Sequence, residues 1–239
     1  MNLVPLQIHL HLGGILFPEL DQADFTGPFE VLSRLPNSTF HIVGKTREPV
    51  RDARGLILTP EKTLAESPPL DVLLVPGGGG VNAVMEDEAV LTFVRQQAAR
   101  AKIVFSVCTG ALVLGAAGLL IGRKATTHWA SHHLLKNLGA TPVNERVVID
   151  GNIVTAAGVT AGLDGALRVT ALLRGESAAQ DTQLYIQYAP EPPFDSGDPS
   201  TAPAAIVQAR RDALAGLITE RLAIVHRVAK KLAIIEQPN

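Results

Sequence analysis

A single cysteine, Cys108, is present among the 239 residues, so the chain cannot form an intramolecular disulfide. The N-terminal segment 1–16 is apolar, but it lacks the basic leader and the small-residue cleavage site of a secretion signal. Both absences favour the cytoplasm as the location of the protein.

The chain has no large excess of either sign of charge. It contains 21 Lys and Arg and 23 Asp and Glu, for a formal net charge of −2. This balance provides no basic surface for nucleic acid. The longest apolar runs, such as 111–121, are shorter than the roughly 18 residues that a membrane span needs. We therefore expect neither nucleic acid nor a membrane as a partner. The hydrophobic content of 46% fits a soluble globular protein with one large core.

Short β-rich runs alternate with helical stretches in the first half of the chain. The predicted strands are 7–17, 70–75 and 102–107, and the helices that follow them are 27–35, 81–101 and 110–120. This order predicts an α/β fold with a doubly wound, mostly parallel sheet and helices on both faces. Ligands of such sheets bind beyond the carboxyl ends of the strands, so the segments after the three strands are candidate site segments.

The second half begins with a predicted hairpin at 146–155, whose Asp-Gly-Asn turn supplies positive φ, and a predicted helix at 158–174. Residues 189–203 are rich in proline and predict an irregular connection. Apolar residues at helical spacing predict an amphipathic helix at 204–235, packed on the domain or on a second subunit. Its basic side chains also suit a membrane surface or nucleic acid. We divide the chain into an α/β domain, 1–203, and a C-terminal helical extension, 204–239.

Cys108 follows an apolar strand and precedes a small-residue helix, with Ser106 and Gly110 two residues away on either side. A nucleophile elbow requires small residues at these positions, because larger side chains would collide across the tight turn. The N–H groups of Thr109 and Gly110 would favour the thiolate and any oxyanion beside it. Alternatively, Cys108 is a small buried hydrophobic residue, and its small neighbours only let the helix pack closely on the strand.

Four consecutive glycines, 77–80, follow Pro76 at the end of the second predicted strand. Without side chains, their backbone N–H groups can approach a ligand closely. No Gly-Lys-Ser/Thr and no dinucleotide fingerprint accompanies them, which argues against phosphate binding. The functional interpretation is an oxyanion-binding loop that faces Cys108, and the structural interpretation is a simple tight turn.

Three carboxyl groups, Glu19, Asp21 and Asp24, lie in the segment after the first predicted strand. Each could act as a general acid or base beside a thiol, and each could instead be a solvated loop residue. His128 and His132 lie at helical spacing without the glutamate of a His-Glu-x-x-His site, so no metal is expected. His128 is also a candidate partner of the thiol, although a surface helix explains it equally well.

Six segments of the chain together resemble the DJ-1/PfpI superfamily, which has a class I glutamine amidotransferase-like, flavodoxin-like sandwich fold. The resemblance runs from about residue 7 to residue 199. Its carriers are Leu16-Phe-Pro-Glu19, Asp24-Phe-Thr-Gly-Pro-Phe-Glu30, Val75-Pro-Gly-Gly78, Val107-Cys-Thr-Gly-Ala-Leu-Val-Leu-Gly-Ala-Ala-Gly118, Ala125-Thr-Thr-His-Trp129 and Gly158-Val-Thr-Ala-Gly-Leu-Asp164.

Segments 183–194 and 24–28 most resemble the isocyanide hydratase branch of this superfamily. The resemblance implies a cofactor-independent hydro-lyase, a homodimer that converts an isonitrile and water into an N-substituted formamide. Most of the superfamily has a glutamate in contact with the cysteine, whereas the matching carboxylate here is that of Asp24. The implied roles are nucleophile for Cys108, general acid/base for Asp24, and shaping of the site by Thr109 and the backbone of Gly78 and Gly79.

In the hypothesised reaction, the Cys108 thiolate attacks the isonitrile carbon while Asp24 transfers the proton. Water then adds to the resulting thioimidate, and the formamide is released. Two other functions fit the same superfamily. One is the domain of a transcriptional regulator, which the single long helix predicted after residue 203 disfavours, because two helix-turn-helix units need several helices. The other is a glyoxalase or redox sensor, in which Cys108 adds to a dicarbonyl or is oxidised.

Overall fold

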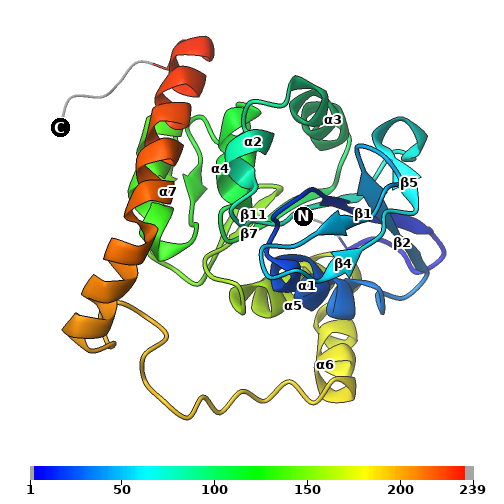
Figure 1. The fold of residues 1–239 in the computed structure, drawn as a ribbon. Helices are drawn as coiled ribbons and strands as arrows, with labels where there is room; N and C mark the ends of the chain where they lie inside the picture. Colours follow the sequence, from blue (N-terminus) through cyan, green and yellow to red (C-terminus); the bar gives the residue numbers. More distant parts are fainter. Residues whose placement is uncertain (1–2, 235–239) are drawn as a thin grey trace.

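A seven-stranded sheet forms the centre of the computed structural model, which describes residues 3–234. The strand order is β10-β11-β7-β6-β1-β2-β5, and every neighbouring pair is parallel except β10 with β11 (Figure 1). The strands of this sheet are β1 (Leu10–Leu16), β2 (Ser38–Gly44), β5 (Lys62–Thr63), β6 (Val72–Val75), β7 (Ile103–Val107), β10 (Val147–Asp150) and β11 (Ile153–Ala156). Two small ribbons lie outside it: antiparallel β3 (Val50–Arg51) with β4 (Ile57–Leu58), and parallel β8 (Lys124–Ala125) with β9 (Thr141–Pro142).

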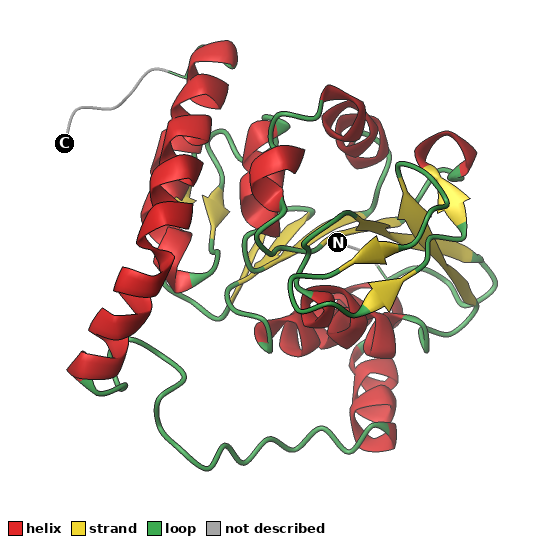
Figure 2. Cartoon of the chain, viewed as in Figure 1, coloured by secondary structure: helices red, strands yellow, loops and turns green. Residues whose placement is uncertain are grey.

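Helices cover both faces of the sheet, as Figure 2 shows. On one face α1 and α5 pack against each other, and α2, α3 and α4 lie on the opposite face (Figure 1). The helices are α1 (Gln22–Leu32), α2 (Val81–Val84), α3 (Glu88–Ala98), α4 (Gly110–Ala116), α5 (Ala161–Arg174), α6 (Glu176–Tyr185) and α7 (Ala204–Lys231), with 3-10 helices η1 (Leu64–Glu66) and η2 (Trp129–Leu138). This architecture confirms the predicted doubly wound, mostly parallel sheet.

The central strands β6 and β7 are apolar along almost their whole length because helices cover both of their faces. Every residue of these two strands is buried, and Phe105 of β7 is among the largest fully buried side chains. None of the helices within residues 3–234 is long and apolar enough to cross a bilayer.

Helix α1 begins five residues before the predicted start at Gly27, so that expectation was wrong. The Asp21 side chain accepts a hydrogen bond from the Ala23 N–H and caps the helix at this earlier point. Pro28 therefore lies inside α1 rather than near its start. As a consequence, Asp24 lies in the first turn of a helix and not in a loop.

The single helix predicted at 81–101 is divided into α2 and α3. The carboxylate of Asp87 accepts hydrogen bonds from the N–H groups of Ala89 and Val90, so it caps a new helix start. Helix α6 was not predicted, whereas the hairpin of β10 and β11 is confirmed.

Helix α7 packs along η2 at one side of the molecule (Figure 1). Its second half holds the buried residues, and Ile206 in its first turn is 58% exposed. The predicted apolar stripe is therefore covered only in part by residues 3–234.

Candidate active site

The candidate site lies where the chain leaves the carboxyl ends of three neighbouring strands, β1, β6 and β7. Cys108 directly follows β7, the glycine loop 76–80 follows β6, and Asp24 is in the helix that follows β1. A cavity of about 300 Å³ contains Cys108, Thr109, Gly78 and Gly79 in its wall. The structure thus brings together all the predicted site residues, with Asp24 buried against the thiol.

The Cys108 backbone has φ of 55°, a left-handed conformation that residues other than glycine rarely adopt. Its N–H donates to the Ala156 carbonyl (2.9 Å), and its own carbonyl accepts from the Thr127 hydroxyl (2.7 Å). These two bonds hold the peptide groups on both sides of the turn. The strained conformation is therefore imposed by the surrounding structure, as in a nucleophile elbow.

Asp24 is fully buried, at 0% exposure. Its Oδ2 accepts a hydrogen bond from the Gly77 N–H (3.0 Å), whereas Oδ1 has no hydrogen-bond partner within residues 3–234. Burial, reinforced by the negative charge of Asp21, raises the pKa of Asp24 to about 8. Asp24 is thus a protonated acid near neutral pH, and its side chain interacts with that of Cys108.

Burial works against the thiolate that the sequence predicts at Cys108. Its side chain is buried and faces the Asp24 carboxyl, and both effects raise its pKa well above the usual value. The Thr109 N–H bonds the sulfur and lowers the pKa, as the sequence predicts, but it does not outweigh burial. The elbow therefore presents a thiol paired with a carboxylic acid.

Hydrogen bonds between its backbone and the Asp24 and Thr109 side chains hold the glycine loop against this pair. The Gly78 N–H donates to the Thr109 hydroxyl (3.0 Å), and that hydroxyl donates to the Gly78 carbonyl (3.2 Å). Because Gly77 and Gly78 use their N–H groups on Asp24 and Thr109, these two groups do not form the predicted oxyanion site. The loop instead positions the acid and the thiol.

Gly78→Ala is expected to destabilise the fold by about 2–4 kcal/mol and to abolish activity. Gly78 has φ of 121°, and an added Cβ would lie 2.4 Å from the Asp21 nitrogen and 2.6 Å from the Glu19 carbonyl oxygen. Gly79→Ala is the matched control, because the nearest atom to its added Cβ is 3.8 Å away. Thermal denaturation of both variants checks this prediction, and equal melting temperatures would contradict it.

The other candidate residues take different places. Asp21 caps α1 and lines the cavity, while Glu19 is exposed and its carbonyl accepts the Gly80 N–H. His128 lines the cavity, and burial together with the Arg221 charge lowers its pKa, so its ring is neutral near pH 7. His132 bonds the Val143 carbonyl (3.1 Å).

Sequence reasoning missed the part of α7 that forms one wall of the cavity. Leu214, Leu217 and Ile218 line it, together with the buried side chain of Arg221. Arg221 follows Leu217 by four residues and Leu214 by seven, so it lies on the apolar stripe of the helix rather than on its basic face. A cation at that spacing is the signal that could have identified it.

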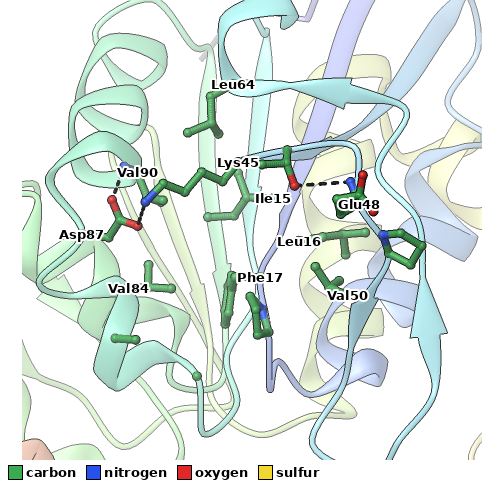
Figure 3. Close-up of a pocket in the computed structure, with 15 residues that line it drawn as sticks. Ile15, Leu16, Phe17, Lys45, Glu48, Val50, Leu64, Val84, Asp87 and Val90 are labelled. Atoms are coloured by element: carbon green, nitrogen blue, oxygen red, sulfur yellow. Dashed lines mark hydrogen bonds and ion pairs between the residues drawn. The ribbon is translucent and has the colours of Figure 1, made fainter.

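A second cavity, of about 460 Å³, lies elsewhere and contains neither Cys108 nor Asp24 in its wall (Figure 3). Apolar side chains such as Ile15, Phe17 and Val84 line it, and an ion pair of Lys45 with Asp87 (2.6 Å) lies beside them. Gly80 belongs to its wall, so the glycine loop separates the two cavities.

An α/β sheet with a cysteine at a strand-to-helix turn, beside a buried acid, defines a class of cysteine-elbow proteins. The model of the DJ-1/PfpI family matches residues 15–171, and the chain belongs to this family. An isonitrile hydratase from Pseudomonas putida is 53% identical over 223 residues, covering 93% of this chain and 98% of the relative. DJ-1alpha from Drosophila melanogaster is 30% identical, over 70% of this chain and 79% of the relative.

A solved structure of a ThiJ/PfpI family protein from Pseudomonas syringae has the same fold, with a TM-score of 0.88. It is 39% identical in sequence, and the match covers 96% of this chain and 94% of the other. The likeness therefore includes the C-terminal helix as well as the α/β domain.

Proposed function

We propose that this protein hydrates isonitriles to N-substituted formamides through a covalent intermediate on Cys108. The observation that carries the proposal is the elbow at Cys108, whose buried side chain faces the fully buried carboxyl of Asp24. An isonitrile carbon carries a lone pair, so it accepts a proton before or as it accepts a nucleophile. The 53% identity to an isonitrile hydratase over nearly the whole chain supports the same assignment.

In the first half of the reaction, Asp24 donates its proton to the isonitrile carbon and the Cys108 sulfur bonds to that carbon. The thiol proton passes to the Asp24 carboxylate, so the acid is restored. The product is a thioimidate, with one C–S bond and one C–H bond formed and the S–H bond broken. Thr109 contributes by holding the Gly78 peptide and by directing its own N–H at the sulfur.

In the second half, water adds to the thioimidate carbon, with its hydroxyl on carbon and its other proton on nitrogen. The C–S bond then breaks, the hydroxyl proton returns to sulfur through Asp24, and the formamide leaves. Atoms balance with water as the only co-substrate, so the scheme assigns no step to a cofactor or a metal. Gly78 and Gly79 lie in the cavity wall and would limit the space around the reacting atoms.

The substrate class follows from the wall that α7 contributes. Leu214, Leu217, Ile218 and Val159 give the cavity an apolar side. An isonitrile with a compact hydrocarbon substituent matches its volume of about 300 Å³. We further propose a cytoplasmic homodimer with no nucleic-acid partner, on the basis of the lone cysteine, the family resemblance and the net charge of −2.

Leu217→Trp is expected to lower kcat/KM for cyclohexyl isocyanide by about tenfold or more, because the larger side chain fills the space of the substituent. The much smaller methyl isocyanide should be affected less than about threefold. Ile206→Trp is the control, since Ile206 is on the same helix but 58% exposed. Equal losses for both substrates would contradict the placement of the substituent against α7.

Formamide formation from cyclohexyl isocyanide, followed by chromatography, tests the proposed function. The competing reaction, lactate formation from methylglyoxal, is measured on the same enzyme. We expect isonitrile hydration to be faster by a wide margin. A faster conversion of methylglyoxal would overturn the proposal in favour of a glyoxalase.

A further inference from the structure

The guanidinium of Arg221 is a buried positive charge without a carboxylate partner. Its side chain is 3% exposed, and no carboxylate oxygen of residues 3–234 forms an ion pair with it. These hydrogen bonds go to neutral acceptors. Nη2 donates to the Gly78 carbonyl (3.1 Å), Nε donates to Asn82 Oδ1 (2.8 Å), and Nη1 donates to Ser131 Oγ (2.9 Å). A buried charge is costly to desolvate unless something compensates it.

The position of Arg221 indicates what the charge compensates. It lines the same cavity as Cys108, and it bonds the carbonyl of Gly78, the residue whose N–H and carbonyl are both held by Thr109. The thiol–acid pair carries a negative charge whenever one of its two protons is removed. That charge lies among buried side chains and interacts with the guanidinium of Arg221. Such an interaction is stronger among buried groups than in water.

We propose that Arg221 is a positioning residue that supplies the counter-charge for the anion formed at Cys108 and Asp24, and that holds the Gly78 peptide against Thr109. The inference rests on Cys108 being the nucleophile of the site. It assigns to α7, which lies beyond the residues matched by the family model, a part in the chemistry as well as in the cavity wall (Figure 1).

Other ionisable groups lie around the same cavity. Asp24 in the first turn of α1 and Asp21, which caps that helix, both raise the pKa of Cys108. Asp52 and Arg54, between β3 and β4, line the cavity, as does His128, the residue before η2. Glu220 precedes Arg221 and accepts from the Asn82 Nδ2 (3.1 Å). Comparison of variants at one position, with all these groups unchanged, isolates the contribution of the guanidinium.

The test is a pH titration of thiolate absorbance, to which Cys108 contributes the only thiol because the chain has one cysteine. In Arg221→Met the midpoint is expected to rise by about one pH unit, and kcat for cyclohexyl isocyanide to fall about tenfold with KM changed less than about twofold. Arg221→Lys retains the charge and should recover most of both values. Cys108→Ser provides the blank for tyrosine absorbance.

Arg227→Met is the matched control, because Arg227 is on the same helix and forms an exposed ion pair with Glu86. It should titrate and turn over like the wild type. A wild-type midpoint in folded Arg221→Met, or an equal shift in Arg221→Lys, would overturn the proposal. If Arg221→Met does not fold, Arg221→Gln keeps an amide donor for the Gly78 carbonyl and is titrated in its place. The titration needs no substrate, so failure of isonitrile hydration leaves its outcome interpretable.

Discussion

Cys108→Ala is expected to lower the rate of formamide production by at least about 10⁴-fold, to the level of the uncatalysed reaction. The loss follows because the proposed scheme passes through a C–S bond that no other side chain of this protein can form, the chain having one cysteine. Alanine keeps the Cβ and removes only the sulfur, and the backbone bonds to Ala156 and Thr127 remain available to hold the turn.

Mass spectrometry of the intact protein provides the second measurement. Wild-type enzyme quenched with acid during turnover should carry the added mass of one isonitrile, and Cys108→Ala should carry none. Cys108→Ser is a useful companion, because its hydroxyl is a far weaker acid and nucleophile in the same position. Full hydration by a folded Cys108→Ala variant would rule out the covalent mechanism.

Asp24→Asn is expected to abolish activity and, at the same time, to make the protein more stable at about pH 8. The folded state raises the pKa of Asp24 from 3.8 to about 8, so between these values it binds a proton that the unfolded chain does not. Stability therefore falls as the pH rises through this window, by a total on the order of 6 kcal/mol. Asparagine is neutral at every pH and can still accept the Gly77 N–H.

The expected signature is a melting temperature that depends less on pH in Asp24→Asn than in the wild type, with the two curves closest near about pH 4. Asp87→Asn is the control, because Asp87 affects the pH dependence of stability with the opposite sign. Bonds from Lys45 and from the start of α3 lower the pKa of Asp87, so its carboxylate stabilises the fold above its unfolded pKa and that stability is lost as the pH falls. Asp24→Asn with wild-type activity would contradict the assigned role of the acid.

Local signals predicted most of the α/β domain. The apolar runs that became β6 and β7 and the Asp-Gly-Asn turn between β10 and β11 depend only on neighbouring residues. The predicted start of α1 was wrong because the side chain of Asp21 caps the helix at an earlier point.

The candidate site divides in the same way. The elbow at Cys108 could be predicted because the small residues on either side of it are close in sequence. The assignment of the acid relied on resemblance, since Glu19, Asp21 and Asp24 are equivalent from sequence alone. Arg221 is not among the predicted site residues, because nothing near it in sequence shows that this basic side chain of the C-terminal helix is buried.

By itself the sequence determined which chemical groups follow which strands: an elbow thiol follows one strand, a glycine loop follows another, and a set of acids follows a third. Only the tertiary structure decided which acid faces the thiol, that burial raises the pKa of both groups, and that a cation from the C-terminal helix lines the same cavity. The physical reason is that protonation depends on desolvation and on charges brought close by packing. Those quantities arise between segments that are distant in the chain, so local sequence patterns do not encode them.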